Sequence, residues 1–199
     1  MIKAAIPEHD EFIAESGAES VVRRKGWVKL YRSQPGWAKA QADAARARKE
    51  GMKIDEFDQQ SFAELEPSMR GPIAGAMLMH DAVSVQDPAD LAGAYGDMFL
   101  SRGGRHIVGD ARTLAESGEG WVVQTGEGPL HAREVVIALG PWSDDVFRPL
   151  GYSMPLGVKR GYHLHFAAEG NARLGRPIYD ADGGFVVAPM RRGVRLTPG

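Results

Sequence analysis

The sequence predicts an α+β (mixed α/β) fold, in which helices flank a mixed, mainly antiparallel sheet. Helical and strand-forming segments alternate in the first half of the chain. After Gly103 and Gly104, short apolar stretches are separated by glycine turns, which is typical of an antiparallel meander. The 43% apolar and 25% charged content is ordinary for a globular domain. A chain of 199 residues can bury the core of one domain, or of one domain with an appendage.

The first half begins with a segment of helical character, residues 7–25, that ends near Gly26. Residues 27–31 alternate and are rich in strand formers, so they predict a strand. A helix follows from Pro35 to Gly51, with proline early and glycine late, as helix ends prefer. Beyond it we expect a strand at 53–57, a short helix at 58–65, a bent strand at 76–85 and a helix that Asp87 caps and Pro88 begins.

The second half is predicted to be mostly strands. Residues 105–114 and 120–132 form the meander, and the unbroken apolar run at 135–139 predicts a strand covered on both faces. Three more strands are expected, over residues 158–166, 184–189 and 194–197.

Composition excludes several classes of function. The chain has no cysteine, which removes disulfides, thiolate nucleophiles, iron–sulfur clusters and cysteine zinc sites. A net charge of −2 gives no broad attraction to nucleic acid or acidic membranes. No apolar run reaches the ~20 residues of a membrane span, and acids and a proline stand where a signal peptide would be apolar. We therefore expect a cytoplasmic protein, with any membrane association peripheral to the inner face.

A strand–glycine–helix junction at residues 135–143 is the first candidate site. Gly140 permits a tight turn and close approach of a ligand, and Pro141 suits the first turn of a helix. Such a junction can present backbone N–H groups to a phosphate or to the polar edge of a ring. From these residues alone, an ordinary strand-to-helix turn is the favoured alternative.

Two motifs in this region resemble a known family. Residues 138–143, with Ala138, Gly140, Trp142 and Ser143, follow an Ala-Gly-X-Trp-Ser-like pattern, and residues 155–163 follow a Pro-Leu … Lys/Arg-Gly-Tyr-His pattern. Both are similar to motifs of the FAD-dependent D-amino acid dehydrogenase/oxidase (DAO-like) family. Residues 193–199 resemble the start of that family's Gly-X-Arg-X-Thr-Gly-Gly segment, with Pro198 where glycine is usual.

The resemblance implies an oxidoreductase that passes a hydride from a small amino (or 2-hydroxy) acid to FAD. It implies two sets of site residues: Ala138, Gly140, Trp142 and Ser143 for the cofactor, and Gly161, Tyr162, His163 and Arg195 for the substrate. It assigns no catalytic side chain and no metal. Arg160, Arg191 and Arg192 are further candidates for the arginine that binds a substrate carboxylate.

The family's dinucleotide fingerprint, G-x-G-x-x-G, does not occur in the 199 residues. Without it, the FAD pyrophosphate lacks its helix N-terminus. We therefore expect one incomplete unit over residues 1–199, a central fragment with a substrate-type domain at 27–109 and 156–197 and part of an incomplete FAD-binding domain at 110–151. The alternative is a non-catalytic binding or oligomerisation module. Either way, we expect self-association through exposed apolar surface.

The histidines leave alternatives open. His163 and His165 alternate with Tyr162, Leu164 and Phe166 and are expected on one face of a strand, where zinc binding is a less favoured alternative. Tyr162 and His163 either face the flavin or substrate or pack between sheet and helix. His80 beside Asp81 is either an oriented acid–base pair or, more often, an exposed strand bend.

Overall fold

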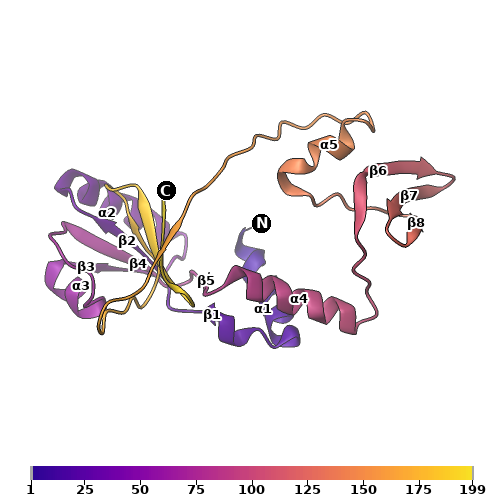
Figure 1. The fold of residues 1–199 in the computed structure, drawn as a ribbon. Helices are drawn as coiled ribbons and strands as arrows, with labels where there is room; N and C mark the ends of the chain where they lie inside the picture. Colours follow the sequence, from indigo (N-terminus) through magenta and orange to yellow (C-terminus); the bar gives the residue numbers. More distant parts are fainter. Residues whose placement is uncertain (1, 199) are drawn as a thin grey trace. The chain divides into compact units, whose positions relative to one another are not determined.

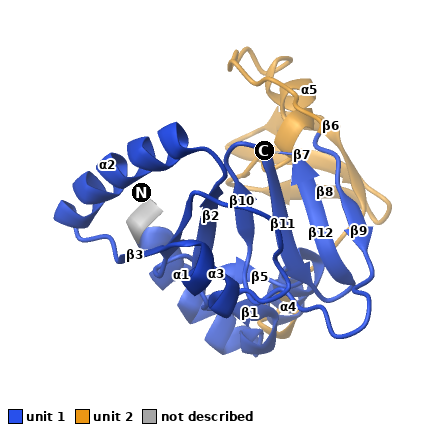
Figure 2. Cartoon of the chain, turned by 90° about the vertical axis from the view of Figure 1, so that its left-hand side faces the viewer, with its two compact units in different colours: residues 1–98, 161–199 blue, residues 99–160 orange. Residues whose placement is uncertain are grey.

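The computed structural model describes residues 2–198, which divide into two compact units (Figures 1 and 2). Unit 1 comprises residues 1–98 and 161–199, and unit 2 comprises residues 99–160. Helices accompany mixed and antiparallel sheets, so the predicted fold class is confirmed. The assignment of substrate-type and FAD-type domains stays a prediction.

Unit 1 is built on a seven-stranded mixed sheet in the order β3-β4-β2-β10-β11-β12-β9. β2 and β10 run parallel, and every other neighbouring pair in this sheet is antiparallel. The strands are β2 (Trp27–Tyr31), β3 (Ile54–Phe57), β4 (Gly75–Met79), β9 (Leu164–Phe166), β10 (Ile178–Asp180), β11 (Phe185–Met190) and β12 (Gly193–Pro198). The sheet therefore joins strands from both ends of the chain.

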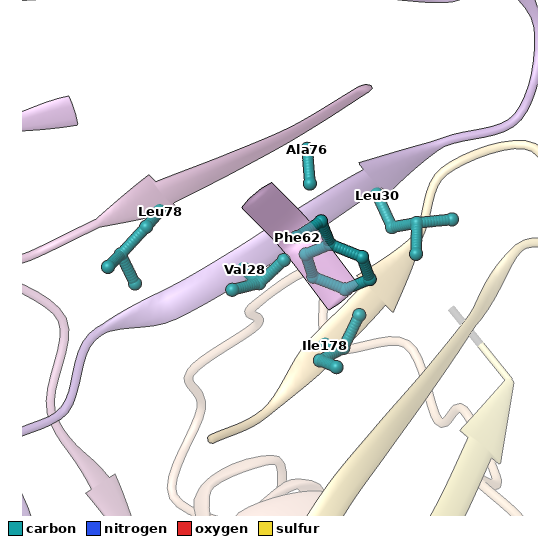
Figure 3. Packing of buried hydrophobic residues seen from close by; sticks show 6 residues of the cluster. All are labelled: Val28, Leu30, Phe62, Ala76, Leu78 and Ile178. Atoms are coloured by element: carbon teal, nitrogen blue, oxygen red, sulfur yellow. The ribbon is translucent and has the colours of Figure 1, made fainter. Parts of the chain in front are cut away.

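The main core lies on one face of this sheet, under helix α3 (Gln59–Leu65). Phe62 of α3 packs there with apolar side chains of the three adjacent strands β4, β2 and β10: Val28, Leu30, Ala76, Leu78 and Ile178 (Figure 3). Asp58 fixes the start of α3, because its carboxylate accepts from the Ser61 backbone N–H at 2.8 Å while the Ser61 hydroxyl accepts from the Asp58 N–H at 3.0 Å.

Helix α2 (Gln34–Lys49) packs against the second face of the sheet. Its buried alanines, Ala40 and Ala44, contact Met77 of β4. Ser33 caps the helix by accepting from the Gly36 N–H at 3.3 Å. By the strand register, Arg195 of β12 and His165 of β9 lie on this same face, beyond the β3–β4–β2 side that α2 covers.

A smaller cluster joins α1 (Ile2–Ser16) to α4 (Pro88–Ser101) through Ile13, Ala18, Val21 and Leu91. The 3-10 turn η1 (Glu19–Val21) leads to β1 (Val22–Arg23), which pairs with β5 (Ser84–Val85). The predicted helix at 7–25 thus lies further toward the N-terminus and ends at Gly17, whose φ of 67° is left-handed. The predicted strand at 76–85 is divided into β4 and β5.

Unit 2 contains the predicted meander: β6 (Gly109–Ser117), β7 (Gly120–Thr125) and β8 (Gly128–Ala132) form a three-stranded antiparallel sheet. The 3-10 turn η2 (Gly140–Trp142) and α5 (Asp144–Phe147) follow. The strand predicted at 135–139 is wrong: these residues are irregular, and Val136 is 88% exposed. A buried strand needs hydrogen-bonded neighbours, and β6–β8 pair among themselves. The predicted strand at 158–166 is likewise reduced to β9.

Over residues 2–198, we find no helix that is both long and apolar enough to cross a membrane.

Candidate functional site

Arg195 lies in the middle of β12, on the face of the sheet that α2 partly covers. Its Cα partners are His165 on β9 and Ala188 on β11. The Arg195 side chain is half-buried, and within the described residues its Nε is buried without a hydrogen-bond partner. A buried guanidinium N–H without an acceptor is costly, so an anionic oxygen placed against this N–H would be stabilised by it.

Two imidazoles lie beside this arginine. His165 is its direct neighbour across the β9–β12 pair, and the rings of His163 and His165 meet edge to face with centroids 5.2 Å apart. Both side chains are exposed. The structure thus brings together His163 and Arg195, which were predicted as substrate residues, and adds His165, which was not. The His-X-His alternation in the sequence indicated that His163 and His165 share a face. It could not place them beside Arg195, because that depends on how β9 pairs with the distant strand β12.

The other candidate arginines are placed differently. Arg191 forms an ion pair with Asp90 of α4. Arg192 is exposed in the turn between β11 and β12. Arg160 belongs to unit 2. Arg195 is therefore the one of the four that lies within a strand of the unit 1 sheet.

Gly161 and Tyr162 lie just before β9 in irregular backbone. Tyr162 is 69% exposed. Both belong to unit 1, as do His163 and Arg195. Among the described residues, neither makes a hydrogen bond or ring contact that indicates a binding role, so their substrate role stays a prediction.

The residues predicted to bind the cofactor, 138–143, belong to unit 2. Gly140 has a left-handed φ of 56°, so the predicted tight turn is present. Ala138 and Trp142 are exposed, whereas Ser143 is buried. The exposed indole of Trp142 can stack on a planar ring, and Ser143 contributes its carbonyl oxygen to the N–H groups of Val146 and Phe147.

This junction does not fit the phosphate end of FAD. The N–H groups of Trp142 and Ser143 already donate within the turn, to Leu139 O at 3.2 Å and Gly140 O at 3.1 Å. The helix that follows, α5, has only four residues. A pyrophosphate site needs free N–H groups at the start of a longer helix. The junction can therefore contact a ring of the cofactor, and it does not provide a phosphate cradle.

His80 does not pair with Asp81, its neighbour in sequence. Its Nε2 lies 2.7 Å from Oδ2 of Asp55, across the β3–β4 pair. Both side chains are largely exposed at the sheet edge. Over the described residues, no cluster of three or more His, Cys, Asp or Glu side chains could hold a metal ion.

Two buried polar clusters were not foreseen from the sequence. Asp180 is buried and accepts from Arg32 Nε at 2.7 Å. Glu66 is buried at the end of α3, where it accepts from the Gly175 N–H at 2.8 Å and pairs with Arg176 at 3.3 Å. Burial raises the pKa of the Glu66 carboxyl, against the opposing effects of the Gly175 N–H and the Arg176 charge.

Comparison with known proteins agrees with the motifs. The family described as FAD dependent oxidoreductase (DAO) matches residues 1–199. The chain belongs to this family. The predicted resemblance is thereby confirmed.

Curated relatives include two D-amino acid dehydrogenases. The protein of Cereibacter sphaeroides (strain ATCC 17023) is 30% identical over 178 residues, which is 85% of this chain and 37% of the relative. The protein of Bradyrhizobium diazoefficiens is 28% identical over 171 residues, 81% of this chain and 37% of the relative. The chain thus spans little more than a third of the length of these relatives.

Solved structures show the same fold. A glycine oxidase from Geobacillus kaustophilus has a TM-score of 0.78 at 22% identity, covering 98% of this chain and 52% of that one. An iminodiacetate oxidase from Chelativorans sp. BNC1 has a TM-score of 0.78 at 16% identity, covering 96% and 53%. At these identities the likeness concerns the fold alone.

Proposed function

We propose that this chain supplies the substrate-binding sheet of an FAD-dependent oxidoreductase that oxidises a small amino (or 2-hydroxy) acid. Membership of the FAD-dependent oxidoreductase family and similarity to D-amino acid dehydrogenases support the reaction class. The observation that carries the proposal is Arg195, whose buried Nε lacks a partner among the described residues.

In this proposal, Arg195 binds the substrate carboxylate. A guanidinium presents two parallel N–H groups to a carboxylate and keeps its charge at every physiological pH. Its position between β11 and β9 holds the side chain at a fixed place on the sheet. Binding the carboxylate at a fixed point orients the neighbouring Cα, which is the atom to be oxidised.

The flavin would accept the electrons when bound. The residues of this chain that would contact it are Ala138, Gly140, Trp142 and Ser143. Since this turn does not provide a phosphate cradle, the FAD pyrophosphate would be bound by residues of the functional enzyme other than 138–143.

The test is to add FAD to the purified chain and record flavin absorbance, and then to follow reduction of a dye by D-amino acids, L-amino acids, glycine and 2-hydroxy acids. Where flavin is retained, substrate-dependent bleaching is the expected result, with Arg195→Met raising KM for the carboxylate substrate while flavin absorbance is unchanged. Stoichiometric flavin that none of these compounds bleaches would overturn the assigned substrate class. A colourless, inactive protein would show that this chain alone does not catalyse the reaction.

A second candidate is a binding or self-associating module without catalysis. It is favoured by exposed apolar side chains of unit 2: Val136 (88% exposed), Val158 (72%) and Trp142 (69%). Light scattering tests it. We expect a mass above that of the 21.6 kDa chain, and a monomer at high concentration would contradict self-association.

A further inference from the structure

The β9–β12 pair creates a row of hydrogen-bond donors on one face of the sheet. His165 and Arg195 are direct partners in register, and such partners in an antiparallel pair have Cβ atoms about 5 Å apart on the same face. The His163 ring lies beside the His165 ring at 5.2 Å. Three donor side chains therefore follow one another along this edge of the sheet.

These donors lack an internal acid. Over residues 2–198, the ion pairs of unit 1 occupy Arg32, Arg48 and Arg176, among others, and none of them includes His163, His165 or Arg195. On the other side of Arg195 stands Ala188, a buried residue without a polar side chain. The row thus combines the positive charge of Arg195 with N–H groups that have no partner among the described residues.

The number of donors indicates the class of ligand. One carboxylate occupies the guanidinium fork of Arg195. Each neutral imidazole can donate one N–H, with the tautomer set by the partner. These two donors remain for a second anionic group on the same molecule.

We propose that Arg195, His165 and His163 bind a small dicarboxylate, with one carboxylate on Arg195 and the second on the two imidazoles. Taken with the proposed function, on which this step rests, the substrate is an amino acid with an acidic side chain. His165 then acts as a specificity-determining residue, because it distinguishes two carboxylates from one.

The test titrates malonate and acetate into the purified chain without flavin, by calorimetry and by NMR of the histidine rings. We expect malonate to bind at least ~10-fold more tightly than acetate, since the second carboxylate gains one or two charge-assisted hydrogen bonds. Malonate should shift the ring signals of both His163 and His165 in the unmodified chain, a readout that needs no variant.

Variants assign the two contacts. His165→Phe keeps an aromatic strand residue and removes the donor, so malonate affinity should fall ~10-fold while acetate affinity stays within about twofold. Arg195→Met should weaken both ligands. The matched control is His131→Phe, at an exposed position of β8 in unit 2, and it should change neither.

Equal affinity for malonate and acetate, or malonate binding that His165→Phe leaves unchanged, would overturn the dicarboxylate site. Because flavin is absent, these outcomes are independent of cofactor uptake. Malonate selectivity in a chain that takes up no FAD would uphold this site and remove only catalysis by the chain.

Discussion

Replacing Asp180 tests how the C-terminal strands are held in the unit 1 sheet. Asp180 ends β10, and its carboxylate is buried. One oxygen accepts from Arg32 Nε at 2.7 Å, and the other accepts from the Gly183 N–H at 2.9 Å. Arg32 follows β2, so this carboxylate links the parallel β2–β10 pair to the turn before β11.

The magnitude follows from these two bonds. A hydrogen bond to a charged group contributes about 1.5–3 kcal/mol and a neutral one about 0.5–1.5 kcal/mol. The Arg32 side chain is 40% exposed, so water replaces part of its loss. We expect Asp180→Ala to lower the free energy of unfolding of unit 1 by about 3 kcal/mol, and Asp180→Asn, which keeps an acceptor for Gly183, by about 2 kcal/mol.

The assay is native-state hydrogen exchange in urea, because the amides of unit 1 can be followed separately from those of unit 2. The amide of Ala181 donates to Leu30 O at 2.9 Å and that of Val28 to Pro177 O at 3.0 Å, so both report on the β2–β10 junction. The control is Asp110→Ala, which removes an exposed ion pair in unit 2 and should leave these amides unchanged. If Asp180→Ala lowers the free energy of unfolding of unit 1 by less than about 1 kcal/mol, the carboxylate acts as a surface charge and does not hold the β2–β10 pair.

Three further predictions concern pH and backbone. Burial raises the pKa of Glu66 above its ordinary 4.5, so the folded chain binds this proton more tightly than the unfolded chain does. Unit 1 should therefore gain stability as pH falls from neutral toward 4.5. Glu66→Gln should flatten this dependence of unfolding free energy on pH, which urea unfolding at several pH values measures. Neighbouring hydroxyl and N–H donors lower the pKa of Asp182 below 3.8, so its contribution is present above that pH and lost as pH falls further, which a carboxyl NMR titration would follow. Gly193→Ala should lower the free energy of local unfolding of β9 by about 1–3 kcal/mol, because φ is +117° and the new methyl meets a β9 carbonyl oxygen. Faster hydrogen exchange of β9 amides checks this. The control is Gly157→Ala, since a methyl group there meets open space.

Elements with complete local signals were predictable. Strand β2 occupies the expected residues 27–31, and helix α2 lies within two residues of its predicted ends because proline, glycine and an alanine-rich run define it locally. The apolar run at 135–139 gave an equally clear signal and does not form a strand. Burial on both faces depends on neighbouring strands, and no pattern within a five-residue run can supply them.

The site was predictable only in part, for the same reason. Family motifs pointed to Arg195 and His163, and alternation placed His163 and His165 on one face. Their proximity to Arg195 depends on the β9–β12 register, which links residues about 30 positions apart. Asp180 and Arg32 are 148 residues apart, and neither has a local pattern that distinguishes it from an ordinary surface charge.

The two ends of the proposed reaction make different demands on the chain. Binding a carboxylate needs a fixed cation without an internal partner, and Arg195 meets that condition within unit 1. Binding a dinucleotide phosphate needs free backbone N–H groups, and the turn at Gly140 uses its own. Since the two demands are met by different residues, they are separable in experiment. Anion binding by unit 1 should therefore be intact in a chain that binds no flavin, and loss of both together would show that the sheet face depends on the cofactor for its structure.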